Sequence, residues 1–326
     1  MNTVQAQLSA VLTAGGPELS RLLARTEDRL AEVAEGYGAE LARHATAILS
    51  AGGKRLRPVL VFLCAASRGD GRLVAAAVAV ELVHMATLVH DDVLDRAELR
   101  RGRPTVFAQG GRLVATATGD MLFSRAFAEL VSTRSEEAIR TLSAASSALA
   151  RGELMQRRDA WRGDVTPERY VERCRLKTAS LFEASCRLGA LFSERPQLSN
   201  EIGMFGAHVG LAFQMLDDVL DVSGPTERTG KPRGADLLDG TVTLPLILAR
   251  GLDPDLAELD LRTVTDATRA AAICDRIAGT GSLEMARREA LTHVAEAKAV
   301  LAGLELAGDR RRALDLVADG VVERYA

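Results

Sequence analysis

The chain has 326 residues, a formal net charge of −3, and 47% hydrophobic but only 4% aromatic residues. The near-neutral charge leaves no face rich in lysine and arginine, which argues against a nucleic-acid partner. Alanine, leucine and arginine dominate and no stretch alternates as a strand does, so the sequence predicts an all-α fold.

The sequence predicts a cytoplasmic protein without a transmembrane segment. No lysine or arginine precedes Arg21 and no compact apolar core leads to a cleavage site, so we expect no signal peptide. The most apolar run, from Leu73 to Val80, is interrupted by Glu81 and is too short to span a bilayer. The four cysteines lack metal-site spacing and are expected to be buried free thiols in a reducing compartment. They are Cys64, Cys174, Cys186 and Cys274.

Two helices are expected before residue 50. One amphipathic helix fills the segment to about residue 35, after a break at Gly15-Gly16-Pro17, and a second runs from Glu40 to Leu49. The segment Gly52-Gly53-Lys54-Arg55-Leu56-Arg57-Pro58 then leads into a third helix, in which Pro58 takes a favoured first-turn position. Its three cations oppose the positive end of the helix dipole, which suits a bound anion because helix N-termini bind phosphate. A solvated basic turn is the alternative for this segment alone.

A long buried helix is expected from Ala75 to Asp95, a stretch without glycine or proline. It ends in the segment Val89-His90-Asp91-Asp92-Val93-Leu94-Asp95, and a nearly identical segment, Met215-Leu216-Asp217-Asp218-Val219-Leu220-Asp221, ends a later helix. Each copy reads Asp-Asp-Val-Leu-Asp. The first and last aspartates of each copy are expected to lie one turn apart on one helix face.

These carboxylates are unfavourable for the helices that carry them. Like charges one turn apart repel each other, and the C-terminal end of a helix is already partly negative. Mg²⁺ would remove the conflict, since it binds through one or two carboxylates and takes its remaining oxygens from water and substrate phosphates. A solvated acidic helix end is the alternative for one copy, but two copies in apolar contexts favour a pair of cation-binding motifs. Because the two copies are expected to face each other, we expect a single domain over residues 1–326 around a shared cavity.

Further helices are expected between the two motifs. Residues 100–105 form a basic loop, residues 119–131 a helix, and residues 140–156 another. The apolar side of the first of these helices carries Met121, Phe123 and Phe127.

A helix start is predicted at Thr166 and Pro167, as N-cap and first-turn proline, and this helix is expected to reach Leu191. Within it, Lys177-Thr178 suggests a kink that turns the threonine hydroxyl toward a ligand. A surface pair is the alternative.

The helix of the second motif is expected from Leu198 to Val222. Gly203, Gly206 and Gly210 suit either close helix packing or a ligand, and Gln214 lies one turn before the motif. Residues 224–240 form a loop rich in glycine and proline, either a lid over a phosphate or an ordinary solvated loop. Its cations are Arg228, Lys231 and Arg233. Pro245 starts another helix, and residues 252–326 show a helical pattern without recognisable chemistry.

Taken in order, these motifs resemble the trans-polyprenyl diphosphate synthases, also called the polyprenyl synthetase family. The resemblance covers about residues 52–243. Its elements are Gly52 to Pro58, Glu81-Leu82-Val83-His84, the first aspartate motif, Arg100-Arg101-Gly102, Lys177-Thr178, and Gln214 with the second motif. It implies a prenyltransferase that joins isopentenyl diphosphate to an allylic diphosphate, built as mostly antiparallel helices around a deep central cavity. It also implies a homodimer that contacts a membrane transiently when it releases its product.

The resemblance further implies roles for the matching positions. Three Mg²⁺ ions would bind Asp91, Asp95 and Asp217, with Asp92, Asp218 and Asp221 in support. Asp218 and Asp221 are grouped with the metal ligands, and Asp92 and Lys177 with the catalytic residues. The allylic diphosphate would contact Arg100, Lys177, Thr178, Gln214 and Lys231. Isopentenyl diphosphate would contact Gly53, Lys54, Arg57, His84 and Arg101.

The chemistry agrees with this resemblance. A diphosphate leaves only when its charge is neutralised, which Mg²⁺, lysine and arginine can do, and the allylic cation must be kept from water. One departure from the family is Thr241, where many relatives carry a second lysine of the lid.

Product length is expected to depend on the helix of the first motif. Val83, Ala86 and Thr87 lie one or two turns before Asp91 and are modest in size, and the family's short-chain enzymes often carry an aromatic residue here. The growing prenyl tail is expected to extend along this helix into the core, in a shaft that these small side chains leave open. This implies an all-trans product of roughly C30 to C50. A short-chain farnesyl or geranylgeranyl diphosphate synthase is the alternative.

Three other functions agree less well with these motifs. Glu81 and His84 form a Glu-x-x-His step as in di-iron bundles, but no partner step exists, since His44 and His293 have glutamate four residues before them. A terpene cyclase usually lacks the second motif and the basic segment before Pro58. A non-catalytic partner subunit tends to lose the aspartate motifs, and both are whole here.

Overall fold

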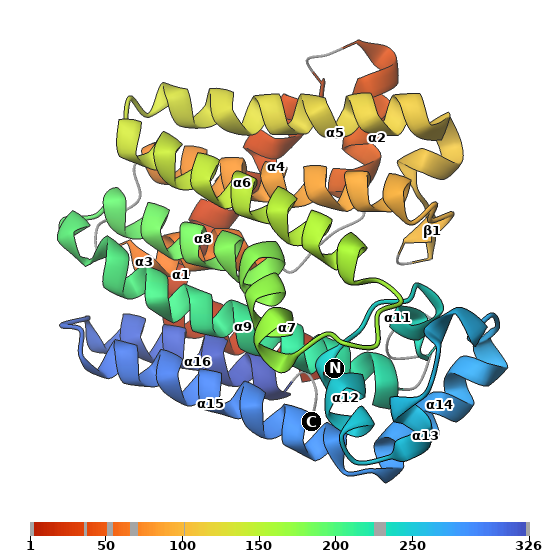
Figure 1. Ribbon diagram of the computed structural model, residues 1–326. Coiled ribbons are helices and arrows are strands. Elements are labelled where there is room, and N and C mark those ends of the chain that lie inside the picture. The colour runs from red at the N-terminus through yellow and green to blue at the C-terminus, as the bar shows by residue number, and fades with distance from the viewer. Residues whose placement is uncertain are drawn as a thin grey trace.

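The computed structural model describes residues 3–35, 38–50, 55–65, 71–100, 102–224 and 233–323 (Figure 1). Over these ranges the regular secondary structure is helical apart from one short hairpin, so the all-α prediction is confirmed. The first half contains α1 (Thr3–Glu35), α2 (Ala39–Ser50), α3 (Leu56–Cys64), α4 (Gly71–Leu94), β1 (Leu99–Arg100), β2 (Arg103–Pro104), α5 (Val106–Ser132) and α6 (Glu136–Asp159). The second half contains α7 (Pro167–Cys174), η1 (Arg175–Ala179), α8 (Ser180–Leu191), η2 (Pro196–Leu198), α9 (Ser199–Ser223), α11 (Ala235–Leu238), α12 (Leu244–Arg250), α13 (Pro254–Ala257), η3 (Leu261–Thr263), α14 (Ala267–Gly279), α15 (Ser282–Ala302) and α16 (Gly308–Glu323).

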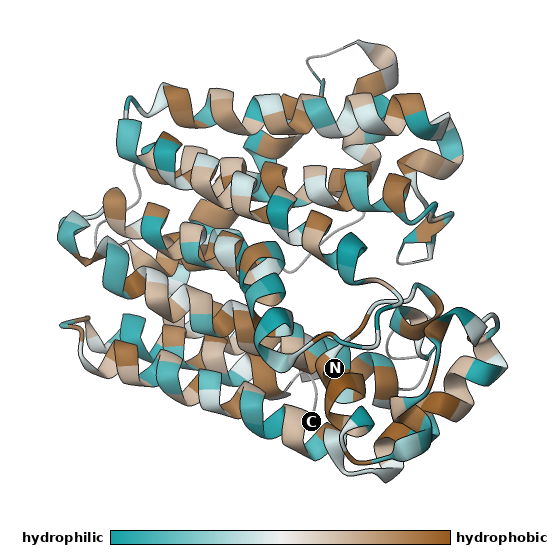
Figure 2. Cartoon of the chain, viewed as in Figure 1, coloured by the Kyte–Doolittle hydropathy of each residue, from teal (hydrophilic) through white to brown (hydrophobic). Residues whose placement is uncertain are grey.

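The long helices stack in rows, from α5 through α4, α8 and α9 to α15 (Figure 1). Outer helices such as α15 show hydrophilic and hydrophobic residues in alternation, as expected when only one face meets the core (Figure 2). The buried apolar side chains form one cluster that reaches from Val11 to Val321. The C-terminal ends of α4 and α9, which carry the two aspartate motifs, lie on the same side of this stack (right in Figure 1).

The central helix α4 is buried along most of its length. Among the described residues it is the one helix that is long and apolar enough to cross a membrane, with 24 residues and a mean hydropathy of 1.8 in its most apolar window. That window is 78% buried inside the protein, as in the core helix of a folded domain. All four cysteines are buried free thiols, as predicted.

Several expected boundaries were wrong. The segment before Gly16 is helical too, and Gly16 (φ 77°) kinks α1 rather than starting it. Helix α5 begins at Val106 instead of residue 119, with a kink at Gly111 (φ 72°), because a single left-handed glycine can redirect a helix without ending it. The segment expected to be a basic loop at residues 100–105 instead takes part in a hairpin, in which Leu99 pairs with Pro104 and Arg100 with Arg103.

The glycines of α9 serve helix packing. A Cβ atom on Gly206 would lie 2.6 Å from the Phe182 carbonyl oxygen, and one on Gly210 would lie 2.6 Å from the Cα atom of Ala179. Both contacts are far closer than real Cβ contacts, so only glycine permits this close approach of α9 to α8 and to the π-helical turn η1 (Arg175–Ala179). Of the two interpretations that the sequence left open, close packing applies.

Arg55, in the middle of the basic segment, ties three helices together. It caps α3 in a left-handed conformation (φ 46°). Its guanidinium donates to Glu81 on α4 at 2.8 Å and to Glu27 on α1 at 2.5 Å. The side chains of Arg55 and Glu81 are only 10% and 5% exposed, so this cation is occupied within the fold. Gly53 and Lys54 lie outside the described residues.

Removal of the Arg55 charge is expected to destabilise the protein. Arg55→Met leaves the carboxylate of Glu81 buried without its partner, which typically costs about 3 kcal/mol in the free energy of unfolding. Urea denaturation measures the loss. Arg21→Met is the matched control, because Arg21 pairs with Glu18 at the surface. Equal midpoints for the two variants would contradict this role for Arg55.

Candidate active site

The first aspartate motif lies at the end of α4. The Asp92 carboxylate is buried, accepts a hydrogen bond from Nε of Arg100 in β1 at 2.8 Å, and forms an ion pair with Nη2 of the same side chain at 2.8 Å. Asp95, just beyond the helix, pairs with Arg157 of α6 at 2.5 Å. Cations of two other segments therefore neutralise part of the repulsion within this motif.

The pKa of Asp91 in this motif is raised by its surroundings. Burial raises its pKa to about 6; the charge of Lys177 opposes this shift, while the nearby charges of Glu153 and Asp95 add to it. A cation placed beside Asp91 would relieve both the desolvation and the repulsion.

The second motif divides into exposed and buried carboxylates. Asp217 is exposed, Asp221 is half-buried, and Asp218 is buried. Asp218 accepts hydrogen bonds from the Tyr170 hydroxyl at 2.7 Å and from Nε2 of Gln214 at 2.8 Å. Burial, with a smaller contribution from the charge of Asp236, raises the pKa of Asp218 to about 8 although these hydrogen bonds oppose the shift.

A π-helical turn, η1, connects the surroundings of the two motifs. The kink suggested at Lys177-Thr178 takes this form, and π turns inside helices are frequent at functional sites. The amine of Lys177 bonds to Glu153 of α6, and its charge acts on Asp91. The Thr178 hydroxyl donates at 2.7 Å to Oε1 of Gln214, whose amide in turn holds Asp218. The two aspartate motifs therefore border one turn of helix.

The ligand atoms of the two motifs do not converge on one point. Among the described residues, the one group of three histidine, cysteine, aspartate or glutamate side chains with ligand atoms within 4.8 Å lies elsewhere, at His208, His293 and Glu296. Widely spaced carboxylates fit ions that complete their coordination with water and diphosphate oxygens, as Mg²⁺ does.

Arg57 is a cation with a free donor. Its guanidinium lies over the Phe182 ring at 4.7 Å, and its Nε atom has no hydrogen-bond partner within the part of the chain that the structure describes. Burial lowers its pKa to about 10, so it stays charged at neutral pH. His84 is half-buried on α4. The remaining residues predicted to contact the two diphosphates lie outside the described part of the chain: Gly53, Lys54, Arg101 and Lys231.

The residues expected to set product length lie where α4 packs on α5. Val83 and Ala86 are fully buried, and Thr87 is half-buried with its hydroxyl donating to the His84 carbonyl. Val83, Ala86 and His90 share one helix face, and the His90 ring stacks on Phe123 of α5 at 5.7 Å.

Phe123 therefore lies level with the first motif. Since α5 runs antiparallel to α4 (Figure 1), Phe127 lies one turn deeper, near the level of Ala86.

Sequence reasoning missed three residues of the site: Glu153, Arg157 and Tyr170. The sequence analysis did not single out these residues, because Glu153 and Arg157 have the i,i+4 spacing of an ordinary helix-surface pair and Tyr170 belongs to no motif. A signal did exist, because Gly152 interrupts an otherwise helical pattern just before Glu153. A Cβ atom on Gly152 would lie 2.5 Å from the backbone nitrogen of Lys177, so this glycine lets α6 approach the π turn.

Comparisons with known proteins agree on one family. A family model described as polyprenyl synthetase matches residues 39–274. The heptaprenyl diphosphate synthase component 2 of Geobacillus stearothermophilus is 41% identical over 273 residues, 82% of this chain and 84% of that protein. The geranylgeranyl diphosphate synthase of Methanosarcina mazei is 36% identical, over 79% and 82% of the two chains.

A solved structure is also closely similar. It is a polyprenyl synthase from Caulobacter crescentus in complex with calcium and isoprenyl diphosphate. It aligns with a TM-score of 0.86 at 33% identity and covers 98% of each chain.

Enlarging Gly152 is expected to impair the site through Lys177. Gly152→Ala places a methyl group against the backbone of the π turn, and a displacement of about 1 Å at a catalytic group can lower kcat about 100-fold. Steady-state kinetics of the prenyl transfer measure this. The matched control is Gly279→Ala, also in a helix but with open space around the site of the added atom. If both variants keep wild-type kcat, the close approach at Gly152 has no functional role.

Proposed function

Because the chain belongs to the polyprenyl synthetase family and is a trans-polyprenyl diphosphate synthase, we propose that it makes a medium or long product, roughly C30 to C50. In this reaction the allylic diphosphate loses its diphosphate, and the double bond of isopentenyl diphosphate attacks the resulting cation. Loss of a proton, for which the departing diphosphate is the proposed acceptor, leaves a chain five carbons longer. The placement of both aspartate motifs around the Lys177-Thr178 turn supports the reaction. The observation that carries the proposed length is the modest size of Val83, Ala86 and Thr87 on the helix of the first motif.

Mg²⁺ is the proposed cofactor, with three ions expected when the allylic diphosphate is bound. The donor set fits this ion, because the motifs offer only carboxylate oxygens and Asp91 stands among other negative groups. When bound, Mg²⁺ would neutralise the charge that develops on the leaving diphosphate. We propose Asp91, Asp95, Asp217 and Asp221 as ligands. Asp218 supports them instead, since Tyr170 and Gln214 already occupy its carboxylate.

The cations are proposed to bind two separate diphosphates. Lys177, Thr178, Gln214, Arg100 and Lys231 would hold the allylic diphosphate, and Lys177 would exchange Glu153 for a phosphate oxygen. Arg57 would bind isopentenyl diphosphate together with Gly53, Lys54, His84 and Arg101, and the free Nε donor of Arg57 supports this role. The proposed lid over the allylic diphosphate has one cation fewer than in many relatives, because Thr241 stands where they carry a second lysine.

The chain is proposed to act as a homodimer in the cytoplasm. Three exposed apolar side chains, Leu113 and Val131 of α5 and Leu154 of α6, offer surface for a second copy. The relative from Geobacillus is named component 2, so a different partner subunit is the competing possibility. Turnover by the purified chain alone, with its mass measured in solution, distinguishes the two.

Activity is expected to require Mg²⁺ and both aspartate motifs. Asp91→Asn or Asp217→Asn should lower kcat at least about 100-fold by removing an oxygen ligand, and EDTA should abolish turnover. Asp28→Asn, at an exposed aspartate of α1, is the matched control. Wild-type turnover in EDTA, or from Asp217→Asn, would refute the proposed mechanism.

Asp91→Asn should raise the thermal stability of the protein when EDTA keeps it free of metal. Since the folded protein raises the pKa of Asp91 to about 6, the charged carboxylate destabilises the fold above that pH. The penalty fades as pH falls from about 6 toward the ordinary value of 3.8. Asp91→Asn should therefore raise Tm at pH 8 and change it little at pH 4.

Product length is expected to respond in opposite directions to two substitutions. Ala86→Phe should block the shaft one turn below the first motif and shorten the product, with the first condensation retained. Phe127→Ala, at the same level on α5, should open the shaft and lengthen it. Chromatography of products made from a farnesyl or geranylgeranyl diphosphate primer measures both. A wild-type product of C15 or C20 would instead identify a short-chain synthase.

A further inference from the structure

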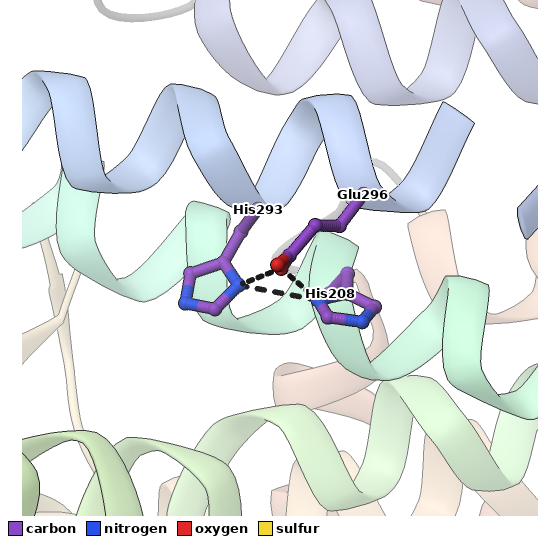
Figure 3. A group of neighbouring side chains, drawn as sticks. All are labelled: His208, His293 and Glu296. Atoms are coloured by element: carbon purple, nitrogen blue, oxygen red, sulfur yellow. Dashed lines mark hydrogen bonds and ion pairs between the residues drawn. The ribbon is translucent and has the colours of Figure 1, made fainter. Parts of the chain in front are cut away.

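Three side chains converge between helices α9 and α15, apart from the proposed active site (Figure 3). His208 comes from α9, and His293 and Glu296 come from α15. The Nδ1 atoms of the two histidines are 3.1 Å apart, and Oε2 of Glu296 lies 3.0 Å from each of them. The side chains of His208, His293 and Glu296 are 23%, 14% and 49% exposed, so the two rings are mostly covered and the carboxylate reaches solvent.

Hydrogen bonds alone cannot account for all three short contacts among His208, His293 and Glu296. Each of the three short contacts needs one hydrogen between its two atoms, and a ring nitrogen offers either one N–H or one lone pair. If both Nδ1 atoms carry hydrogens and donate to Glu296, the two nitrogens face each other as donors. If one of them is unprotonated, its lone pair faces either the other nitrogen or the carboxylate oxygen. At most two of the three contacts can therefore be hydrogen bonds.

We propose that His208, His293 and Glu296 form a binding site for a divalent transition-metal ion of the Zn²⁺ type, which cross-links α9 to α15. Two imidazole nitrogens and one carboxylate oxygen are a familiar zinc donor set, with the fourth position left to water. A tetrahedral ion with bonds of about 2.0–2.1 Å has ligands about 3.3 Å apart, close to the spacing seen here.

The donor types separate this site from the aspartate motifs. Imidazole nitrogen suits Zn²⁺, Cu²⁺ or Ni²⁺, whereas Mg²⁺ takes oxygen ligands. Burial, partly offset by Glu296, lowers the pKa of His208, which keeps that ring in the neutral form that binds metal. His293 and Glu296 lie three residues apart on one face of α15, so both reach the same point without any change of backbone.

A bound ion would act as a clamp on the helix that carries the second aspartate motif. His208 precedes Asp217 by about two and a half turns of α9, roughly 13 Å along the axis. The ion would therefore stabilise the α9–α15 pair without touching the diphosphates. The expected readouts are binding and thermal stability, which are independent of prenyl transfer and of its proposed mechanism.

The test uses untagged full-length protein with millimolar Mg²⁺ present, so that the aspartate motifs are occupied. Titration of Zn²⁺ against a chromogenic chelator should show one tight site per chain, and Zn²⁺ should raise Tm. His293→Gln and Glu296→Gln should each weaken binding at least about 100-fold, since loss of even an outer partner of a metal ligand costs 10–100-fold. Glu289→Gln is the matched control, with the same charge change at an exposed position of α15.

Co²⁺ provides an independent signature. Its visible absorption should report nitrogen ligands in the wild-type protein and lose that signature in His208→Gln. Circular dichroism shows whether each variant remains folded. Glu296→Gln changes a half-exposed side chain, so we expect this variant to fold. Equal Zn²⁺ affinity in wild type and in the ligand variants, or a wild-type site that Mg²⁺ displaces, would overturn the proposal.

Discussion

The structure depends on holding carboxylates at the negative ends of two helices. The aspartate motifs end α4 and α9, where the helix dipole and neighbouring charges both oppose them. The surrounding helices supply the compensation. Arg100 and Arg157 pair with the first motif, and Tyr170 and Gln214 donate hydrogen bonds to the second. The pKa of Asp91 nevertheless stays raised, so the compensation is incomplete at the point where a cation is expected.

Backbone packing around the π turn makes this compensation possible. Gly152 of α6 and Gly210 of α9 press against the turn from two sides, each in a contact that a Cβ atom would forbid. The turn is thereby fixed between the helix that supplies Glu153 and the helix that supplies Gln214. Those two side chains hold Lys177 and Thr178, so glycine packing and polar contacts fix the same two residues.

The sequence was sufficient for features that depend on local pattern. The repeated Asp-Asp-Val-Leu-Asp segments, the cap at Thr166 and the irregularity at Lys177-Thr178 were each read from a few adjacent residues. Features that depend on a distant partner were not. Arg55 read as a candidate phosphate ligand, but Glu27 and Glu81 occupy it. Glu153 was not recognised as a site residue because its partner, Lys177, is 24 residues away. Periodicity describes one helix face, whereas these contacts depend on which helix lies opposite.

Helix α9 shows why ligand chemistry matters more than charge in this fold. Transition metals generally bind nitrogen and oxygen donors more tightly than Mg²⁺ does, so selectivity depends on the type of ligand offered. The end of α9 that carries Asp217 and Asp221 offers carboxylate oxygens and no nitrogen ligand from its own motif. Two and a half turns earlier, His208 faces His293, and nitrogen dominates the donor set. A transition-metal ion therefore has its proposed place where α9 packs on α15, and the oxygen-only end remains suited to ions that bring water and diphosphate as their other ligands.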